Sequence, residues 1–122
     1  MGLDQYAYKV LGEPYDDPDK GLCYPEKIEI AYWRKHSDLQ GWMKNLYEEK
    51  GGTEEFNCEK VWLEAEDLER LYEDVVNDNL PPTTGFFFGQ SRPEEKENDL
   101  EFIALALMAL KQGYKVYYYS WW

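Results

Sequence analysis

Apolar and polar residues alternate along three segments in the first half of the chain, and this two-residue period predicts β-strands. The segments cover residues 4–10, 27–33 and 59–64. Residues 12–25, between the first two segments, contain three prolines and two glycines among acidic side chains, which is typical of a loop. Trp33 lies opposite the apolar positions of its strand, so we expect its side chain on the surface.

The period then changes to that of amphipathic helices, in which apolar residues recur three and four positions apart. It predicts helices over residues 39–47, 68–76 and 99–111. Ser37 and Gln40 have the spacing of a capping box before the first helix. The third apolar stripe is the widest, which predicts that the third helix is the most deeply buried.

Aromatic residues close the chain in the sequence YYYSWW, residues 117–122. Rings on both sides of a pleated strand need cover on both faces, so we predict an interior strand over residues 114–121. Trp122 either packs back over the first strand or faces a partner. We expect a short strand at the GFFFG segment, residues 85–89, and a further capping signature at residues 91–94.

The order of these elements predicts a layered fold. A chain of 122 residues is long enough to bury one core. We therefore expect a single acidic α+β domain over residues 1–122, in which a small mixed or mainly antiparallel sheet packs against about three helices on one face.

Charge is distributed unevenly along the chain. The net charge is −12, and residues 48–101 hold 17 acidic and 5 basic residues, so they carry the whole excess. Phosphates would be repelled there, which disfavours direct binding of nucleic acid and favours a protein partner with a basic surface. No apolar run is long enough to span a bilayer, so we expect no membrane contact.

Few residues in this chain are of the kinds that bind metals firmly. Cys23 and Cys58 are expected to be reduced thiols of a cytosolic protein. Because His36 is the only histidine, a zinc site of the usual Cys/His kind cannot be assembled unless carboxylates complete it. The acidic residues 13–19 lack the glycine and the distant glutamate of an EF-hand loop. We therefore predict neither a metal nor a cofactor.

The second predicted helix has an acidic outer side. Its apolar stripe fixes the buried side, and Arg70 is the only cation among the outward residues. We predict that a partner is contacted by four carboxylates of this helix and by the last residue of the chain: Glu66, Glu69, Glu73, Asp74 and Trp122. Glu69 and Glu73 repel each other across one turn, and such repulsion fits a surface that must be uniformly negative.

A basic cluster offers a second candidate site. It comprises Trp33, Arg34, Lys35, His36 and Ser37, at the junction between a strand and a helix N-terminus. Free backbone amides, the helix dipole and two cations could hold a phosphate or carboxylate there. His36 could act as an acid or base, and Trp33 could stack on a ligand. In the alternative interpretation, the two cations pair with carboxylates and His36 merely precedes the helix cap.

Five motifs together give the chain a resemblance to a known group. MGLDQYAYK, AYWRKHSDLQGWM, FNC, GFFFG and YYYSWW resemble, from end to end, a set of small bacteriophage and prophage proteins without an assigned activity. The resemblance implies a viral context and no catalytic residues. Small acidic phage proteins often disable host machinery, and several imitate the charge of DNA, which implies action in the host cytoplasm.

Three hypotheses follow. We favour a non-enzymatic phage accessory protein that binds and inhibits a host protein through a nucleic-acid-mimicking acidic face, as in anti-restriction or anti-CRISPR counter-defence. The first alternative is a binder or hydrolase of a small phosphorylated ligand that uses the basic cluster. The second is a virion or scaffold component, which a symmetric oligomer would indicate.

Overall fold

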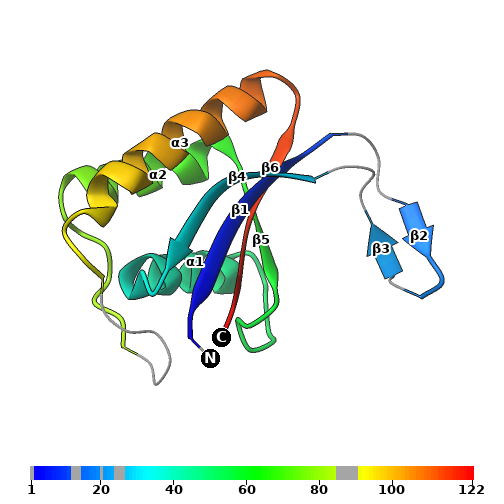
Figure 1. Ribbon diagram of the computed structural model, residues 1–122, viewed down its shortest axis with the longest axis horizontal. Helices are drawn as coiled ribbons and strands as arrows, with labels where there is room; N and C mark the ends of the chain where they lie inside the picture. Colours follow the sequence, from blue (N-terminus) through cyan, green and yellow to red (C-terminus); the bar gives the residue numbers. More distant parts are fainter. Residues whose placement is uncertain (1, 12–14, 20, 24–26, 85–90) are drawn as a thin grey trace.

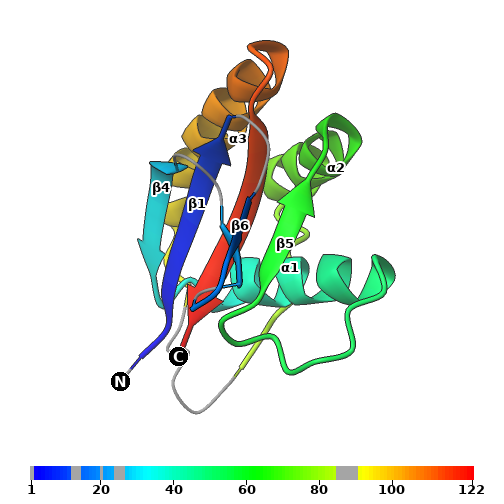
Figure 2. The ribbon, with the colours of Figure 1, turned by 90° about the vertical axis from the view of Figure 1, so that its right-hand side faces the viewer.

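The protein is a single α+β domain, described here by a computed structural model for residues 2–11, 15–19, 21–23, 27–84 and 91–122. Its elements are β1 (Asp4–Val10), β2 (Tyr15–Asp17), β3 (Gly21–Cys23), β4 (Lys27–Arg34), α1 (Ser37–Glu49), β5 (Lys60–Leu63), α2 (Ala65–Val76), α3 (Glu95–Lys111) and β6 (Lys115–Trp121). Four strands form one antiparallel sheet in the order β4-β1-β6-β5. The three helices cover one face of it (Figures 1 and 2). The predicted fold class is confirmed.

The last strand lies inside the sheet. β6 pairs with β1 on one side and with β5 on the other. Tyr118 points into the core and is fully buried, and Tyr117 on the opposite face is covered by the rings of Tyr8 and Trp62. The prediction of an interior strand, made from the rings on both sides of its pleat, is confirmed.

The helices cover the face of the sheet that carries Trp33, whereas the sequence pattern predicted Trp33 on the surface. Trp33 is only 2% exposed and packs edge-on against Phe102 of α3. Tyr32, its neighbour on β4, faces the open side and donates its hydroxyl to Asp4. A tyrosine can keep its ring half-covered and its hydroxyl wet, whereas the larger indole fills the core better. The prediction that Trp33 lies on the surface was wrong.

The helices begin where tertiary contacts satisfy their first amides. α1 starts at Ser37 itself, with His36 as its N-cap and no local side-chain cap, so the predicted Ser37–Gln40 capping box does not form. A capping box occurs instead at α2, between Glu64 and Asp67. Glu94 precedes α3 without a side-chain cap.

One side of α3 faces solvent, so the prediction that it is the most deeply buried helix was wrong. Leu105 and Met108 are exposed, although both widen the apolar stripe. The buried residues of α3 are Glu95, Asp99, Phe102, Ile103, Ala106 and Ala109. They follow the helical period, and the first two are carboxylic acids.

Two other predictions fall in the connections. Residues 12–25 were expected to be a loop, but within them β2 and β3 form a small antiparallel hairpin that extends away from the main sheet (Figure 1). The GFFFG segment, predicted as a short strand, lies outside the described residues.

Candidate functional site

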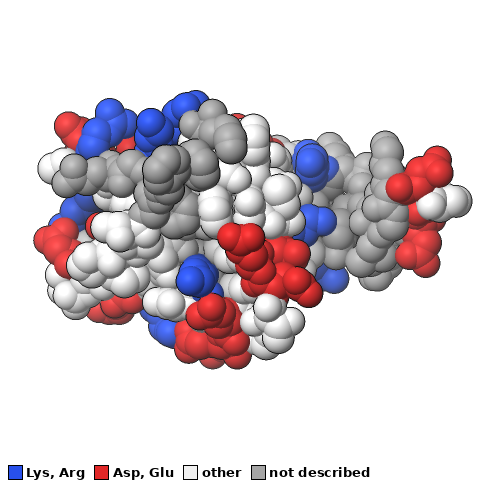
Figure 3. All heavy atoms as spheres, turned by 90° about the horizontal axis from the view of Figure 1, so that it is seen from below, with Lys and Arg blue, Asp and Glu red and all other residues white. Residues whose placement is uncertain are grey.

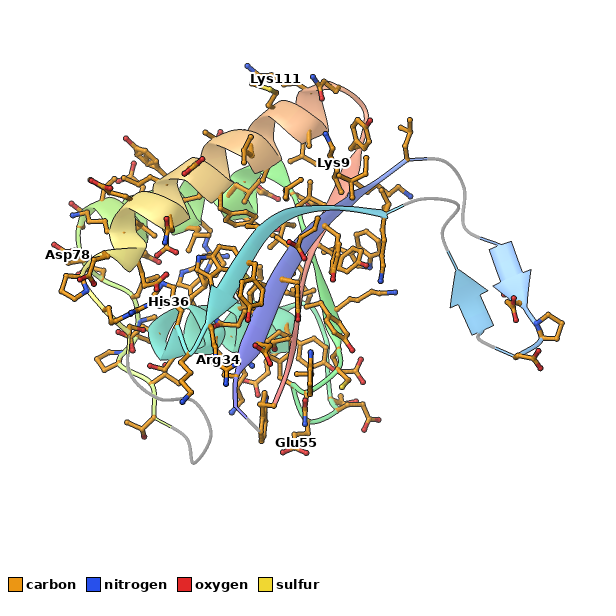
Figure 4. All side chains as sticks on the ribbon, in the orientation of Figure 1. Lys9, Arg34, His36, Glu55, Asp78 and Lys111 are labelled. Atoms are coloured by element: carbon orange, nitrogen blue, oxygen red, sulfur yellow. The ribbon has the colours of Figure 1, made fainter. Side chains whose placement is uncertain are left out.

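His36 is held at the junction of β4 and α1 by contacts along its backbone. Lys35 adopts a left-handed conformation with φ 58°, which turns the chain from strand to helix. The Gln5 side chain accepts a hydrogen bond from the His36 amide at 2.8 Å and donates one to the His36 carbonyl at 2.9 Å. Figure 4 shows His36 on the helix side of the sheet, between α3 and α1. The imidazole is therefore directed into the protein.

Both ring nitrogens of His36 have partners from distant parts of the chain. Nδ1 lies 2.7 Å from Ser91 Oγ, and Nε2 lies 2.8 Å from Asp99 Oδ2. The other oxygen of Asp99 accepts a hydrogen bond from Trp33 Nε1 at 3.0 Å. Ser91 Oγ also accepts a hydrogen bond from the Asp38 amide at 2.9 Å. Ser91 thus caps α1, although its sequence position suggested a cap for α3.

The surroundings of Asp99 are poorly suited to a charge. Burial raises the pKa of the Asp99 carboxyl above its ordinary value, although hydrogen bonds from His36 and Trp33 oppose the shift. Glu95, one turn earlier on α3, is also buried and adds to this increase. Arg92 contacts Glu95 at 3.4 Å, but its side chain is 71% exposed and its charge is well screened by water.

A cavity of about 290 Å³ adjoins this cluster, lined among others by His36, Ser91, Glu95 and Asp99. The chain of contacts from Ser91 through His36 to Asp99 has the order of nucleophile, base and orienting carboxylate. Ser91 already serves as a helix cap, however, so this connectivity has a structural purpose of its own. The arrangement can pass a proton along the chain of contacts or bind a cation between its carboxylates.

The predicted basic cluster does not converge on one point. Arg34 and Lys35 are exposed, their side chains lie beside Gly2, and Arg34 is 3.6 Å from Asp4. His36 and Ser37 are buried on the helix side. Because Trp33 lies in the core, it gives no aromatic wall to an anion site either. The five residues therefore occupy two separate environments.

The acidic helix α2 presents its carboxylates as predicted, with one exception. Glu66, Glu69 and Glu73 are exposed. Asp74 is half-buried, because its Oδ2 accepts a hydrogen bond from Trp42 Nε1 at 2.7 Å. We call the three exposed residues the α2 carboxylate row.

Trp122 is fixed by hydrogen bonds rather than free. Its backbone exchanges two hydrogen bonds of 3.0 Å with the Asn57 side chain, and its indole donates to the Phe56 carbonyl at 3.1 Å. Trp122 also lines a second cavity of about 500 Å³, together with Lys44 and Glu48 of α1. Figure 3, which views the molecule from below relative to Figure 1, shows the acidic side chains of that face in separate clusters with basic ones between them.

Sequence reasoning identified His36 but missed the three residues around it. The capping signature at residues 91–94 predicts that Ser91 caps the third helix, whereas its actual partner His36 lies 55 positions away in the sequence. For Asp99 there was a signal. It lies three and four residues before Phe102 and Ile103, and Glu95 lies one turn earlier, so both acids extend the buried stripe of α3.

Comparisons add no relative to this picture. No known protein family, no curated protein and no solved structure matches the chain. Among the described residues, no helix has both the length and the apolar character needed to cross a membrane.

Proposed function

We propose that this protein is a non-enzymatic phage accessory protein that binds a basic surface of a host protein in the host cytoplasm and blocks it. The carboxylates of the α2 row stand in for the phosphates of a nucleic acid. The phage context comes from the resemblance of the sequence motifs. The observation that carries the proposal is the row itself, because Glu66, Glu69 and Glu73 are exposed on one helix.

The packing of α2 supports this role. Leu68, Leu71 and Val75 are buried, which fixes the orientation of the helix and leaves the row outward. Arg70, the only cation on α2, is 3.3 Å from Glu49 of α1, and both side chains are more than half exposed. An exposed ion pair of this kind contributes little to stability and is screened by salt. The charge of the row is therefore left available to a partner.

Local energetics do not explain the row. Glu69 and Glu73 are four residues apart and repel each other by a few tenths of a kcal/mol. Only the first turn, where Glu66 lies, gains from the positive end of the helix dipole. A surface that must attract cations would retain these charges in spite of the repulsion.

Asp74 and Trp122 both have contacts within the protein, so variants of these two residues cannot test the proposed interface cleanly. Asp74 is engaged with Trp42, so its removal would weaken the α1–α2 packing along with any partner contact. Trp122 is hydrogen-bonded to Phe56 and Asn57, so its substitution would disturb the end of the chain. Their predicted partner contacts stay predictions, and the decisive variants belong to the α2 row.

The test compares two triple variants with equal changes in charge. E66Q/E69Q/E73Q neutralises the row, and E94Q/E97Q/E101Q neutralises three exposed residues at and within α3. Each protein is immobilised and exposed to lysate of the host, and captured proteins are identified by mass spectrometry. The proposal expects at least one basic protein to be captured by the parent and by the α3 variant but not by the α2 variant.

The captured protein then allows a measurement of affinity. Exposed ion pairs contribute roughly 0.2–1 kcal/mol each, so loss of the row should weaken binding by about tenfold at low salt. The dependence of Kd on salt should flatten as well, because fewer ion contacts form. If the two triple variants bind the partner equally well, net charge and not this row governs the contact, and the proposal is refuted.

A further inference from the structure

Three buried side chains come together beside the cavity of about 290 Å³. They are His36, Glu95 and Asp99, which are 3%, 6% and 1% exposed. One ligand atom from each lies within 4.8 Å of the others. Glu95 and Asp99 are one turn apart on α3, and His36 reaches them from the start of α1. We call these residues the buried triad.

Two carboxyl groups are unusual so close together in a protein interior. Burial penalises each charged form, and a second carboxyl alongside adds repulsion. Arg92 approaches Glu95 at 3.4 Å from a largely exposed position, so it offsets the charge only in part. A cation placed between the two carboxyl groups would offset both, and the adjoining cavity gives it room.

We propose that the buried triad binds one divalent transition-metal ion, with His36 Nε2 and one oxygen each from Glu95 and Asp99 as ligands. One imidazole and two carboxylates suit Zn²⁺, Mn²⁺ or Fe²⁺. Calcium takes six to eight oxygens, more than this set supplies. The carboxylates thus complete a site that the single histidine could not form with the cysteines.

The geometry needs only a small adjustment. Ligand atoms about 2.0–2.2 Å from a common zinc ion lie roughly 3.5 Å apart in a tetrahedral site. His36 Nε2 and Asp99 Oδ2 are already 2.8 Å apart, so that pair must open slightly, and a pair of ligand atoms nearer to the upper limit of 4.8 Å must close. Glu95 can supply this movement, because its partner Arg92 is on the surface.

Neighbouring residues would hold the ligands in place. In the absence of metal, Nε2–H can donate to Asp99 and Nδ1 can accept from Ser91. With metal on Nε2, the neutral ring carries its proton on Nδ1 and donates it to Ser91 Oγ. Trp33 Nε1 continues to hold the second oxygen of Asp99. Metal-binding histidines and carboxylates commonly have such outer partners, and their loss costs 10- to 100-fold in affinity.

The test is a titration of chelator-treated protein with ZnCl2 by isothermal calorimetry, repeated with MnCl2, MgCl2 and CaCl2. The proposal expects one saturable Zn²⁺ or Mn²⁺ site per chain and weaker or no binding of Mg²⁺ and Ca²⁺. At about 100 times Kd, bound metal should raise Tm by several degrees. Absence of a one-to-one site for both transition metals overturns the proposal.

Matched variants place the ion. E95Q should weaken binding by at least about tenfold, whereas E97Q, an exposed residue on the same helix, should bind like the parent. S91A should also weaken binding by about tenfold, although Ser91 is not a ligand. Equal binding by E95Q and E97Q overturns the assignment. Circular dichroism of each variant verifies that it is folded.

Cobalt gives an answer that does not depend on any variant. Co²⁺ bound to the buried triad should produce visible absorption bands of a low-coordinate nitrogen and oxygen site. An intense thiolate charge-transfer band would assign the ion to a cysteine such as the exposed Cys58, and a spectrum like that of aqueous Co²⁺ would exclude a low-coordinate site. Either spectrum contradicts the proposal. Both leave the proposed function of the α2 row untouched.

Discussion

Replacement of Tyr118 by phenylalanine removes one hydroxyl group from the centre of the protein while the ring stays in place. Tyr118 is fully buried on the interior strand β6. Its hydroxyl accepts a hydrogen bond from Gln5 Nε2 at 2.9 Å and donates one to Gln40 Oε1 at 2.6 Å. These two bonds connect the sheet to α1 and to the residue that holds His36.

The expected cost follows from these contacts. Gln5 keeps its bond to the His36 carbonyl, but Gln40 Oε1 loses this donor in the interior. An unsatisfied buried acceptor costs about 1–3 kcal/mol, so we expect Y118F to lower the free energy of unfolding by about 2 kcal/mol. For a chain of this length that corresponds to roughly 8 °C in Tm.

Urea unfolding and calorimetry measure this difference, with Y72F as the control. Tyr72 is exposed on α2, and its change should cost less than about 0.5 kcal/mol. If Y118F unfolds within about 0.5 kcal/mol of the parent, the two hydrogen bonds of the Tyr118 hydroxyl do not contribute the predicted stability.

The same variant gives a dependence on pH. Burial raises the pKa of Tyr118 well above its ordinary value of 10.0. Its contribution is complete below pH 10 and declines above it, because the unfolded tyrosine then ionises while the folded one stays protonated. The difference in stability between parent and Y118F should therefore shrink from pH 9 to pH 11. A constant difference would contradict the assignment.

Three further predictions concern other parts of the fold. S91A should lower the free energy of unfolding by about 1–2 kcal/mol in urea, because the Asp38 amide of α1 loses its cap; no loss would show that the cap is not used. Deletion of residues 117–122 removes most of the central strand and should abolish cooperative melting in circular dichroism; a cooperative transition near the parent Tm would refute it. Neutralisation of the α2 carboxylate row should leave stability unchanged or raised by a few tenths of a kcal/mol, as measured in urea; a large loss would show that the row supports the fold.

Most helices and strands of this fold could be predicted because the apolar pattern within each segment indicates its secondary structure. Amphipathic period identified all three helices, and alternation identified β1, β4 and β5. The interior position of β6 followed from rings on both faces of one strand. The short β2–β3 hairpin was missed because Pro and Gly within it read as loop residues, although they also occur in tight hairpins.

The candidate site was harder to predict because it depends on contacts between distant segments. Which face of β4 is buried depends on where α3 packs, so alternation alone could not decide between Tyr32 and Trp33. Ser91 acts on α1 and not on its own helix, which no local signature reveals. Asp99 fits the apolar period of α3, but the sequence alone does not distinguish it from the other acidic residues among the 25 of the chain, and Glu95 lies before the predicted start of this helix at residue 99.

Competition with nucleic acid tests whether the α2 carboxylate row occupies a nucleic-acid-binding surface of the partner. The captured host protein is mixed with a fluorescent oligonucleotide that it binds, and anisotropy is followed while the parent protein, the α2-row variant E66Q/E69Q/E73Q or the α3 variant is added. We expect the parent and the α3 variant to displace the oligonucleotide, whereas displacement by the α2-row variant should need about tenfold more protein. If a ternary complex forms, or if all three proteins compete equally, the α2 carboxylates do not occupy a nucleic-acid-binding surface.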